Sequence, residues 1–279
     1  MARTRKLVAA LSRRGPHRVL RGDLAFAGLP GVVYTPESGL NLPGVAFGHD
    51  WLTGTARYSG LLEHLASWGI VAGAPETERG LAPSVLNFAF DLGTTVDIVS
   101  GVRLGPGQIS VHPAKLGMVG HGFGGSAAVF AAAGMPAKLA AAAAIFPTTT
   151  SPPAEQPAAT LKVPGLILSA PGEPKSLTSN ALALSHAWEA GTLRIARKAQ
   201  PKGLVEGRRL TKVFGLGGPH RRTQRSVRAL LTGYLLYILG GDKTYRDFAD
   251  PEVRLPKTEQ VDPEAPPVAL EEKIVALLK

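Results

Sequence analysis

The chain has 279 residues, of which 44% are hydrophobic, and this is enough to bury the core of one large α/β domain. It holds 33 glycines and 23 prolines, which favours many turns, and no cysteine, which excludes disulfides, thiolate metal sites and cysteine nucleophiles. The net charge of +10 suits solubility, an anionic lipid surface or an acidic partner, whereas 6% aromatic residues and no recognisable motif argue against nucleic acid.

The N-terminal residues 1–22 carry seven Lys or Arg side chains and no acid. Leu7, Val8 and Leu11 share one helical face, so residues 1–21 are a candidate helix for an anionic membrane surface; a frayed basic tail fits the same pattern. The apolar run 7–11 is shorter than a signal-peptide core of about 7–15 residues, and no run approaches the roughly 18 needed to span a bilayer. We therefore expect a cytoplasmic protein, with association at the membrane surface as an alternative.

The following 230 or so residues alternate short apolar runs with amphipathic stretches. A hairpin is expected over 23–36. Further strands are expected at 42–48, 70–74, 115–119, 140–146, 163–169 and 209–214, and helices at 56–68, 86–102, 126–133, 180–191 and 224–239. This alternation predicts an α/β fold with a mostly parallel central sheet and helices on both faces.

The composition changes near residue 250. Residues 251–267 hold five prolines, which is typical of an extended linker, and 268–279 form an amphipathic helix that could dock on the domain or on a partner. We therefore divide the chain into a basic segment 1–22, an α/β domain 23–250, and a C-terminal part 251–279.

The stretch 115–128 organises the chain, because it predicts a buried strand, a tight turn and the start of a small-residue helix. Its centre, Gly120-His121-Gly122-Phe123-Gly124, follows the nucleophile-elbow pattern G-x-S-x-G, but glycine stands where the serine should be. Gly122 offers no nucleophile. Glycine also relieves the backbone strain of about 1–3 kcal/mol that this turn imposes on other residues. The neighbouring His121 and the nearby Ser126 are both expected to pack rather than to react.

An acyl-transfer site further needs a base, an acid and two backbone N–H groups that stabilise the oxyanion. His220 lies in a loop after the expected last strand and is the candidate base. Glu173, four residues after the strand 163–169 ends, is the candidate acid. Either residue fits an ordinary solvated loop equally well. The oxyanion donors are expected to be the N–H of Phe123 and one from the loop around Trp51, whose ring would also form an aromatic wall.

These residues together resemble the α/β-hydrolase superfamily, most closely its bacterial cutinase, polyester-hydrolase and dienelactone-hydrolase branch. The resemblance covers about residues 22–248 and rests on residues 47–51, on 65–71, on the elbow, and on the loops that carry Glu173 and His220. It implies the α/β-hydrolase fold, with Glu173 and His220 as acid and base and with Trp51 and Phe123 at the oxyanion hole. Because Gly122 departs from the family's serine, the resemblance points to a homologue that binds or scaffolds, or to other chemistry.

Two hypotheses about function follow. In the first, the chain is a non-catalytic hydrolase homologue that binds an acyl or lipid-like ligand or a protein partner. In the second, it is a weak or serine-independent ester hydrolase or acyltransferase, in which His220 and Glu173 activate water or a second substrate. Neither needs a cofactor or a metal. If acid, base and oxyanion hole persist, the sequence predicts that Gly122→Ser restores hydrolysis of a short activated ester.

Overall fold

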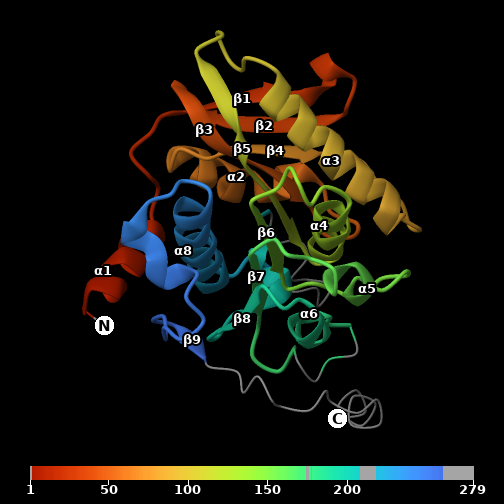
Figure 1. Cartoon of the computed structure of the whole chain (residues 1–279), viewed down its shortest axis with the longest axis vertical. Coiled ribbons are helices and arrows are strands. Elements are labelled where there is room, and N and C mark those ends of the chain that lie inside the picture. The colour runs from red at the N-terminus through yellow and green to blue at the C-terminus, as the bar shows by residue number, and fades with distance from the viewer. Residues whose placement is uncertain (1, 174–175, 177, 208–217, 260–279) are drawn as a thin grey trace.

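The computed structural model describes residues 2–173, 176, 178–207 and 218–259, which build a nine-stranded sheet with helices packed against it (Figure 1). The strand order is β1-β2-β4-β3-β5-β6-β7-β8-β9. The strands are β1 (Val19–Asp23), β2 (Gly31–Pro36), β3 (Gly39–Gly48), β4 (Val71–Pro75), β5 (Ile109–His121), β6 (Ala141–Ile145), β7 (Gly165–Ser169), β8 (Gly191–Ala196) and β9 (Thr258–Glu259).

The six strands from β4 to β8 in this order run parallel to one another. At one edge β2 is antiparallel to both β1 and β4, and at the other edge β9 is antiparallel to β8. The chain leaves β3 to form β4 on one side and later returns to place β5 on the other side. The carboxyl ends of β3 and β5 therefore flank a topological switch point, where α/β sheets tend to bind ligands.

Helices cover both faces of the sheet (Figure 1). One core cluster joins the sheet to α1 (Ala2–Leu11), α2 (Ser59–Ser67) and α8 (Arg221–Ile238). A second core cluster joins the opposite face to α3 (Val85–Gly101), α4 (Phe123–Gly134), α5 (Glu155–Ala158) and α6 (Ala181–Ala187). The predicted α/β class, with a mostly parallel sheet covered on both faces, is confirmed.

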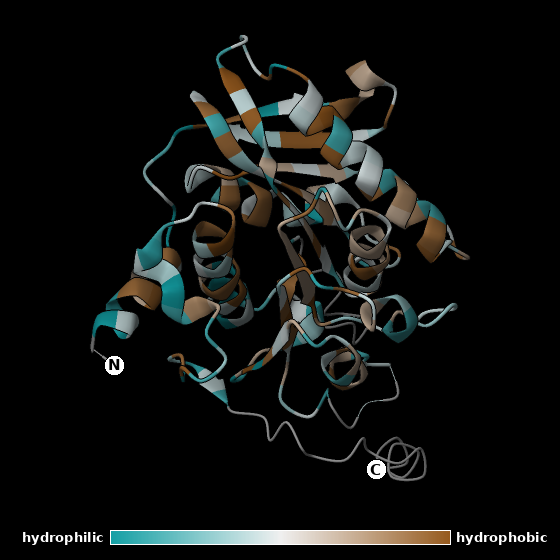
Figure 2. Cartoon of the chain, in the orientation of Figure 1, coloured by the Kyte–Doolittle hydropathy of each residue, from teal (hydrophilic) through white to brown (hydrophobic). Residues whose placement is uncertain are grey.

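The N-terminal helix α1 is amphipathic and packs against α8, so its apolar side belongs to the domain core (Figure 2). Val8 is 3% exposed and Leu11 is fully buried, and Thr4 Oγ1 donates to Asp247 Oδ2 at 3.0 Å. Two of the three side chains that would enter a membrane in the sequence interpretation are therefore already covered, and the third, Leu7, is partly buried against the same cluster. Any membrane contact by this segment would depend chiefly on its exposed basic residues. No helix within the described ranges is long and apolar enough to cross a bilayer.

The helix expected over 180–191 ends at Ala187, and the strand β8, which was not expected, begins at Gly191. The helix stops because Trp188 turns into the core and packs on Gly165, where a β-carbon would lie 2.4 Å from the indole. β8 was missed because its centre holds Arg194, which reads as a surface residue. Arg194 is 5% exposed and donates hydrogen bonds to the carbonyl oxygens of residues 247, 250 and 253.

Two elements expected in the C-terminal third lie outside the described residues. They are the strand expected at 209–214 and the helix expected at 268–279. Within the expected linker, residues 258–259 form the short edge strand β9.

Candidate functional site

The turn between β5 and α4 has the strand–turn–helix geometry expected for the elbow. Gly122 occupies it with φ 55° and ψ −119°, a backbone conformation that disfavours any side chain. The flanking glycines allow a very close approach of strand, helix and β3. A β-carbon on Gly120 would lie 1.9 Å from the carbonyl oxygen of Gly124, and one on Gly124 would lie 2.3 Å from the carbonyl oxygen of Gly48.

The carboxylate of Asp50 fills the space in front of this turn. Its Oδ1 accepts the backbone N–H of Trp51 at 2.8 Å and the backbone N–H of Phe123 at 3.0 Å. These are the two donors expected to form the oxyanion hole, and they do converge on one oxygen atom. That oxygen, however, belongs to the chain itself. A β-carbon on Gly122 would lie 2.0 Å from it, so Asp50 stands where a nucleophile side chain would need to be.

The buried side chains of Tyr58 and His121 form a polar pair next to Asp50. The hydroxyl of Tyr58 accepts the backbone N–H of Asp50 at 3.1 Å and lies 2.8 Å from Nδ1 of His121. Burial, and then the Asp50 charge, raises the pKa of Tyr58. Burial lowers the pKa of His121, while the Asp50 charge and the carbonyl of Pro201 oppose this shift. Near neutral pH the pair is therefore an uncharged support, and the His121 ring packs edge-on against Phe146.

The other hydroxyl near the turn is committed to the core. Ser126 is fully buried, and its Oγ donates to the carbonyl oxygen of Thr148 at 2.5 Å. It therefore does not replace the missing nucleophile.

The candidate acid and base each have local partners. Oε2 of Glu173 accepts the N–H of Ala170 at 2.9 Å and the hydroxyl of Ser169 at 3.2 Å, and burial raises the pKa of this carboxyl to about 7. His220 caps the start of α8, with Nδ1 2.8 Å from Oγ1 of Thr223. Among the hydrogen bonds of the described residues, none joins Glu173 to His220.

The short 3₁₀ helix η4 (Pro201–Leu204) connects His220 to the elbow. The carbonyl of Pro201 in this segment acts on the pKa of His121, and the N–H of His220 donates to the carbonyl of Gly203 at 2.8 Å. The structure therefore brings Gly122, Trp51 and Phe123 together around Asp50 and places His220 one segment away. Asp50 was missed as a site residue. The sequence feature that could have indicated Asp50 is an acid in the loop after β3 in a chain that has glycine at the nucleophile position.

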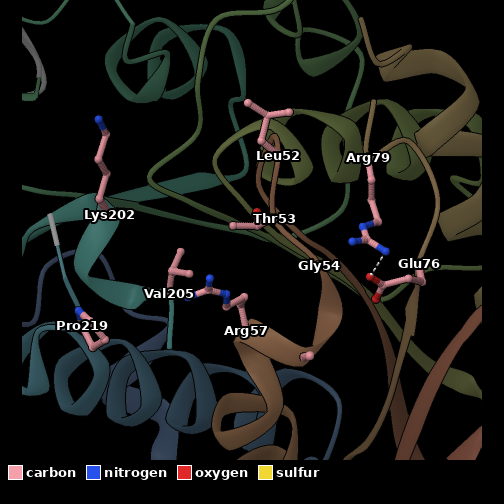
Figure 3. A pocket seen from close by; sticks show the side chains of 10 residues that line it. Leu52, Thr53, Gly54, Arg57, Glu76, Arg79, Lys202, Val205 and Pro219 are labelled. Carbon is pink, nitrogen blue, oxygen red and sulfur yellow. Dashed lines mark ion pairs between the residues drawn. The ribbon is translucent and has the colours of Figure 1, made fainter. Parts of the chain in front are cut away.

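A cavity of about 400 Å³ opens beside this loop (Figure 3). Its walls come from the segments that follow β3 and β4 and from η4 and the residues after it, including Leu52, Arg57, Arg79, Lys202 and Val205. Neither Gly122 nor His220 lines it. In the part of the chain that the structure describes, no group of three or more His, Asp or Glu side chains is arranged to hold a metal ion.

Comparison with known proteins gave no family for this chain. No protein-family model matches it, and no curated protein sequence matches it. The likeness to α/β-hydrolases therefore remains a prediction that rests on the residues of the elbow and of the surrounding loops.

The raised pKa of Glu173 predicts a pH-dependent stability. The folded protein holds this proton up to about pH 7, whereas the ordinary value is 4.5, so the contribution to stability is complete below 4.5 and is lost as the pH rises through 7. The full shift corresponds to about 3 kcal/mol. Glu173→Gln imitates the protonated acid, so it should match wild type at pH 4.5 and exceed it by up to this amount above pH 7. Urea unfolding across this range measures the difference.

A second titrating group, His64 in α2, also changes the stability with pH, so the test must compare the two variants at each pH. Burial, and then the charge of Arg228, lowers its pKa from 6.5 to about 4, so its contribution falls as the pH drops through this range, opposite in sign to that of Glu173. The stability of the wild-type protein therefore changes less with pH than Glu173 alone would make it change. The exposed Glu252→Gln is the control for loss of a surface carboxylate. Parallel profiles for wild type and Glu173→Gln would contradict the burial of a protonated Glu173.

Proposed function

We propose that this chain is a non-catalytic α/β-hydrolase homologue that binds an acyl or lipid-like ligand or a protein partner. The observation that carries this proposal is the Asp50 carboxylate seated on both expected oxyanion donors in front of Gly122. The fold assignment is supported by the sharp turn between β5 and α4. It is further supported by the second N–H donor, which comes from the loop after β3, as in the elbow of that superfamily.

One part of the acyl-transfer apparatus is missing, and a second part is occupied by the chain itself. Gly122 supplies no nucleophile, and loss of a serine nucleophile costs about 10⁶ in turnover in a working protease. In addition, a carboxylate in the hole places negative charge where a substrate oxyanion would have to develop. A ligand-binding role needs neither part, and the turn and its glycines then serve to position the loops around the cavity.

The alternative is an active hydrolase or acyltransferase that uses His220 and Glu173. The local partners of both side chains, Thr223 for the histidine and Ala170 for the glutamate, do not favour it. The two functions predict different reactivity toward probes of serine hydrolases.

We expect the full-length protein to remain unlabelled by a fluorophosphonate probe. We also expect its background hydrolysis of a p-nitrophenyl ester to be equal in wild type and in His220→Ala, because no side chain at the elbow can be acylated. His17→Ala, which removes an exposed histidine, is the matched control, and a working serine esterase shows that the probe is competent. Stoichiometric labelling of a serine, or a rate lost in His220→Ala and retained in His17→Ala, would overturn the non-catalytic function.

A further inference from the structure

The cavity beside the oxyanion loop lies at the edge of the sheet where ligands are expected. Its walls include Leu52 and Gly54, which follow β3, and Glu76 and Arg79, which follow β4. β3 ends at the topological switch point between β3 and β5, and β4 is the neighbour of β3 on its other side. At about 400 Å³ the cavity falls within the range of about 300–1,000 Å³ that is usual for small-molecule sites.

The charges around this cavity are unbalanced. Arg79 is paired with Glu76 at 2.9 Å, and the other oxygen of Glu76 accepts the N–H of Thr55 at 2.7 Å, so that carboxylate is already committed. Arg57 and Lys202 have no ion-pair partner among the described acidic residues. Arg57 and Lys202 therefore line the cavity as cations without a described anion, and Figure 3 shows the Lys202 amine pointing away from Arg57.

One of these cations is held in position. Arg57 makes two hydrogen bonds with the backbone of Glu206. The carbonyl oxygen of Arg57 accepts the N–H of Glu206 at 2.8 Å, and Nη1 of Arg57 donates to the carbonyl oxygen of Glu206 at 3.2 Å. The remaining guanidinium donors have no partner among the described hydrogen bonds. Lys202 comes from η4, a different wall of the cavity (Figure 3). An anion at Arg57 would gain charge-assisted hydrogen bonds at a small cost in ordering Arg57, and the exposed Lys202 side chain would turn toward it.

The same cavity has an apolar wall. Leu52 is 55% exposed at its edge, and Val205 and Pro219 line the side nearest α8. Leu52 is held with φ 54°, a conformation that a leucine adopts only when the surrounding loop imposes it. Exposed apolar side chains beside unpaired cations suit a ligand with one charged end and one apolar end.

We propose that this cavity binds a small organic anion, with its anionic head group at Arg57, where the exposed Lys202 side chain turns toward it, and a short apolar body against Leu52 and Val205. This assignment names the ligand class of the proposed binding function and rests on it. A carboxylate and a phosphate monoester share the required chemistry. A bare inorganic anion lacks the apolar body, and an anionic membrane surface presents its head groups on a bilayer that the cavity cannot enclose.

Calorimetric titration of the full-length protein with octanoate tests the proposal. Octanamide, which has the same chain without the charge, and inorganic phosphate, which has charge without the chain, serve as comparisons. We expect saturable binding of octanoate, binding of both comparisons at least tenfold weaker, and affinity that falls with added salt. Lys202→Gln should weaken octanoate binding about tenfold, since it removes one charge-assisted contact. Lys243→Gln, an exposed lysine on another surface, should not.

Three results would overturn this assignment. The first is that octanamide or phosphate binds as tightly as octanoate, and the second is that Lys202→Gln and Lys243→Gln bind octanoate with equal affinity. The third is that octanoate does not bind, while the protein sediments with phosphatidylglycerol vesicles in a way that depends on Lys202. Arg57→Gln gives a second, independent loss of charge, and thermal unfolding of each variant separates lost binding from lost folding. If octanoate does not bind and the fluorophosphonate probe labels no serine, only the proposed ligand class is contradicted. If the probe labels a serine, the non-catalytic function itself is contradicted.

Discussion

Gly124→Ala is expected to destabilise the protein by about 3–5 kcal/mol or to prevent its folding, because it overpacks a contact between backbone atoms. A β-carbon at this position would lie 2.3 Å from the carbonyl oxygen of Gly48 and 2.4 Å from that of His49. Neither atom is the end of a flexible side chain, so α4 and β3 would have to move apart. Urea unfolding of the purified variant, or its soluble yield, measures the effect.

Gly134→Ala is the matched control, since it makes the same change in the same helix. A β-carbon at Gly134 has no atom within 4 Å, so this variant should be neutral or slightly stabilising. Equal stability of the two variants would show that α4 does not approach β3 as closely as described. That approach matters for the site, because it brings the N–H of Phe123 at the start of α4 to the carboxylate of Asp50, which follows β3.

The sequence predicts much of this architecture because the signals are local. Apolar runs of five to eight residues between helical stretches mark β3, β4, β6 and β7 to within a few residues. The elbow is visible because three glycines at alternate positions are needed there, one for its backbone conformation and two for the close approach. Such requirements are written in the residues themselves.

What the sequence does not reveal depends on partners distant in the chain. Arg194 appears polar until the carbonyl groups of 247–253 surround it, and α1 appears to be a free basic helix until α8 covers Val8 and Leu11. Asp50 likewise appears to be a loop residue. It lies 73 positions from Phe123, and only the packing of α4 on β3 brings the two together. Long-range contacts of this kind leave no periodic signal.

Asp50 changes what is expected when a serine is restored. In Gly122→Ser the new β-carbon would lie 2.0 Å from Oδ1 of Asp50. The variant therefore carries backbone strain of about 1–3 kcal/mol, and it also weakens the charge-assisted bonds to Asp50, each worth about 1.5–3 kcal/mol. We expect it to be less stable than wild type by about 3–5 kcal/mol and inactive, because the displaced carboxylate still competes for the hole.

Asp50→Ala/Gly122→Ser removes the obstruction and vacates both N–H donors. The double variant loses both bonds to Asp50 and keeps the backbone strain, but it is free of the clash with Asp50. Its loss of stability should therefore be smaller than the sum of the losses in the two single variants, a non-additivity that a double-mutant cycle measures. It should also hydrolyse a short p-nitrophenyl ester above background, and adding His220→Ala should abolish this gain if His220, which is bonded to Gly203 of η4, serves as the base. Additive free energies in the cycle would mean that Asp50 does not occupy the position of the missing nucleophile. A stable but inactive double variant would show that emptying the hole does not bring Glu173 and His220 into a working acid–base pair, so that their local bonds to Ala170 and Thr223 are the lasting state of both side chains.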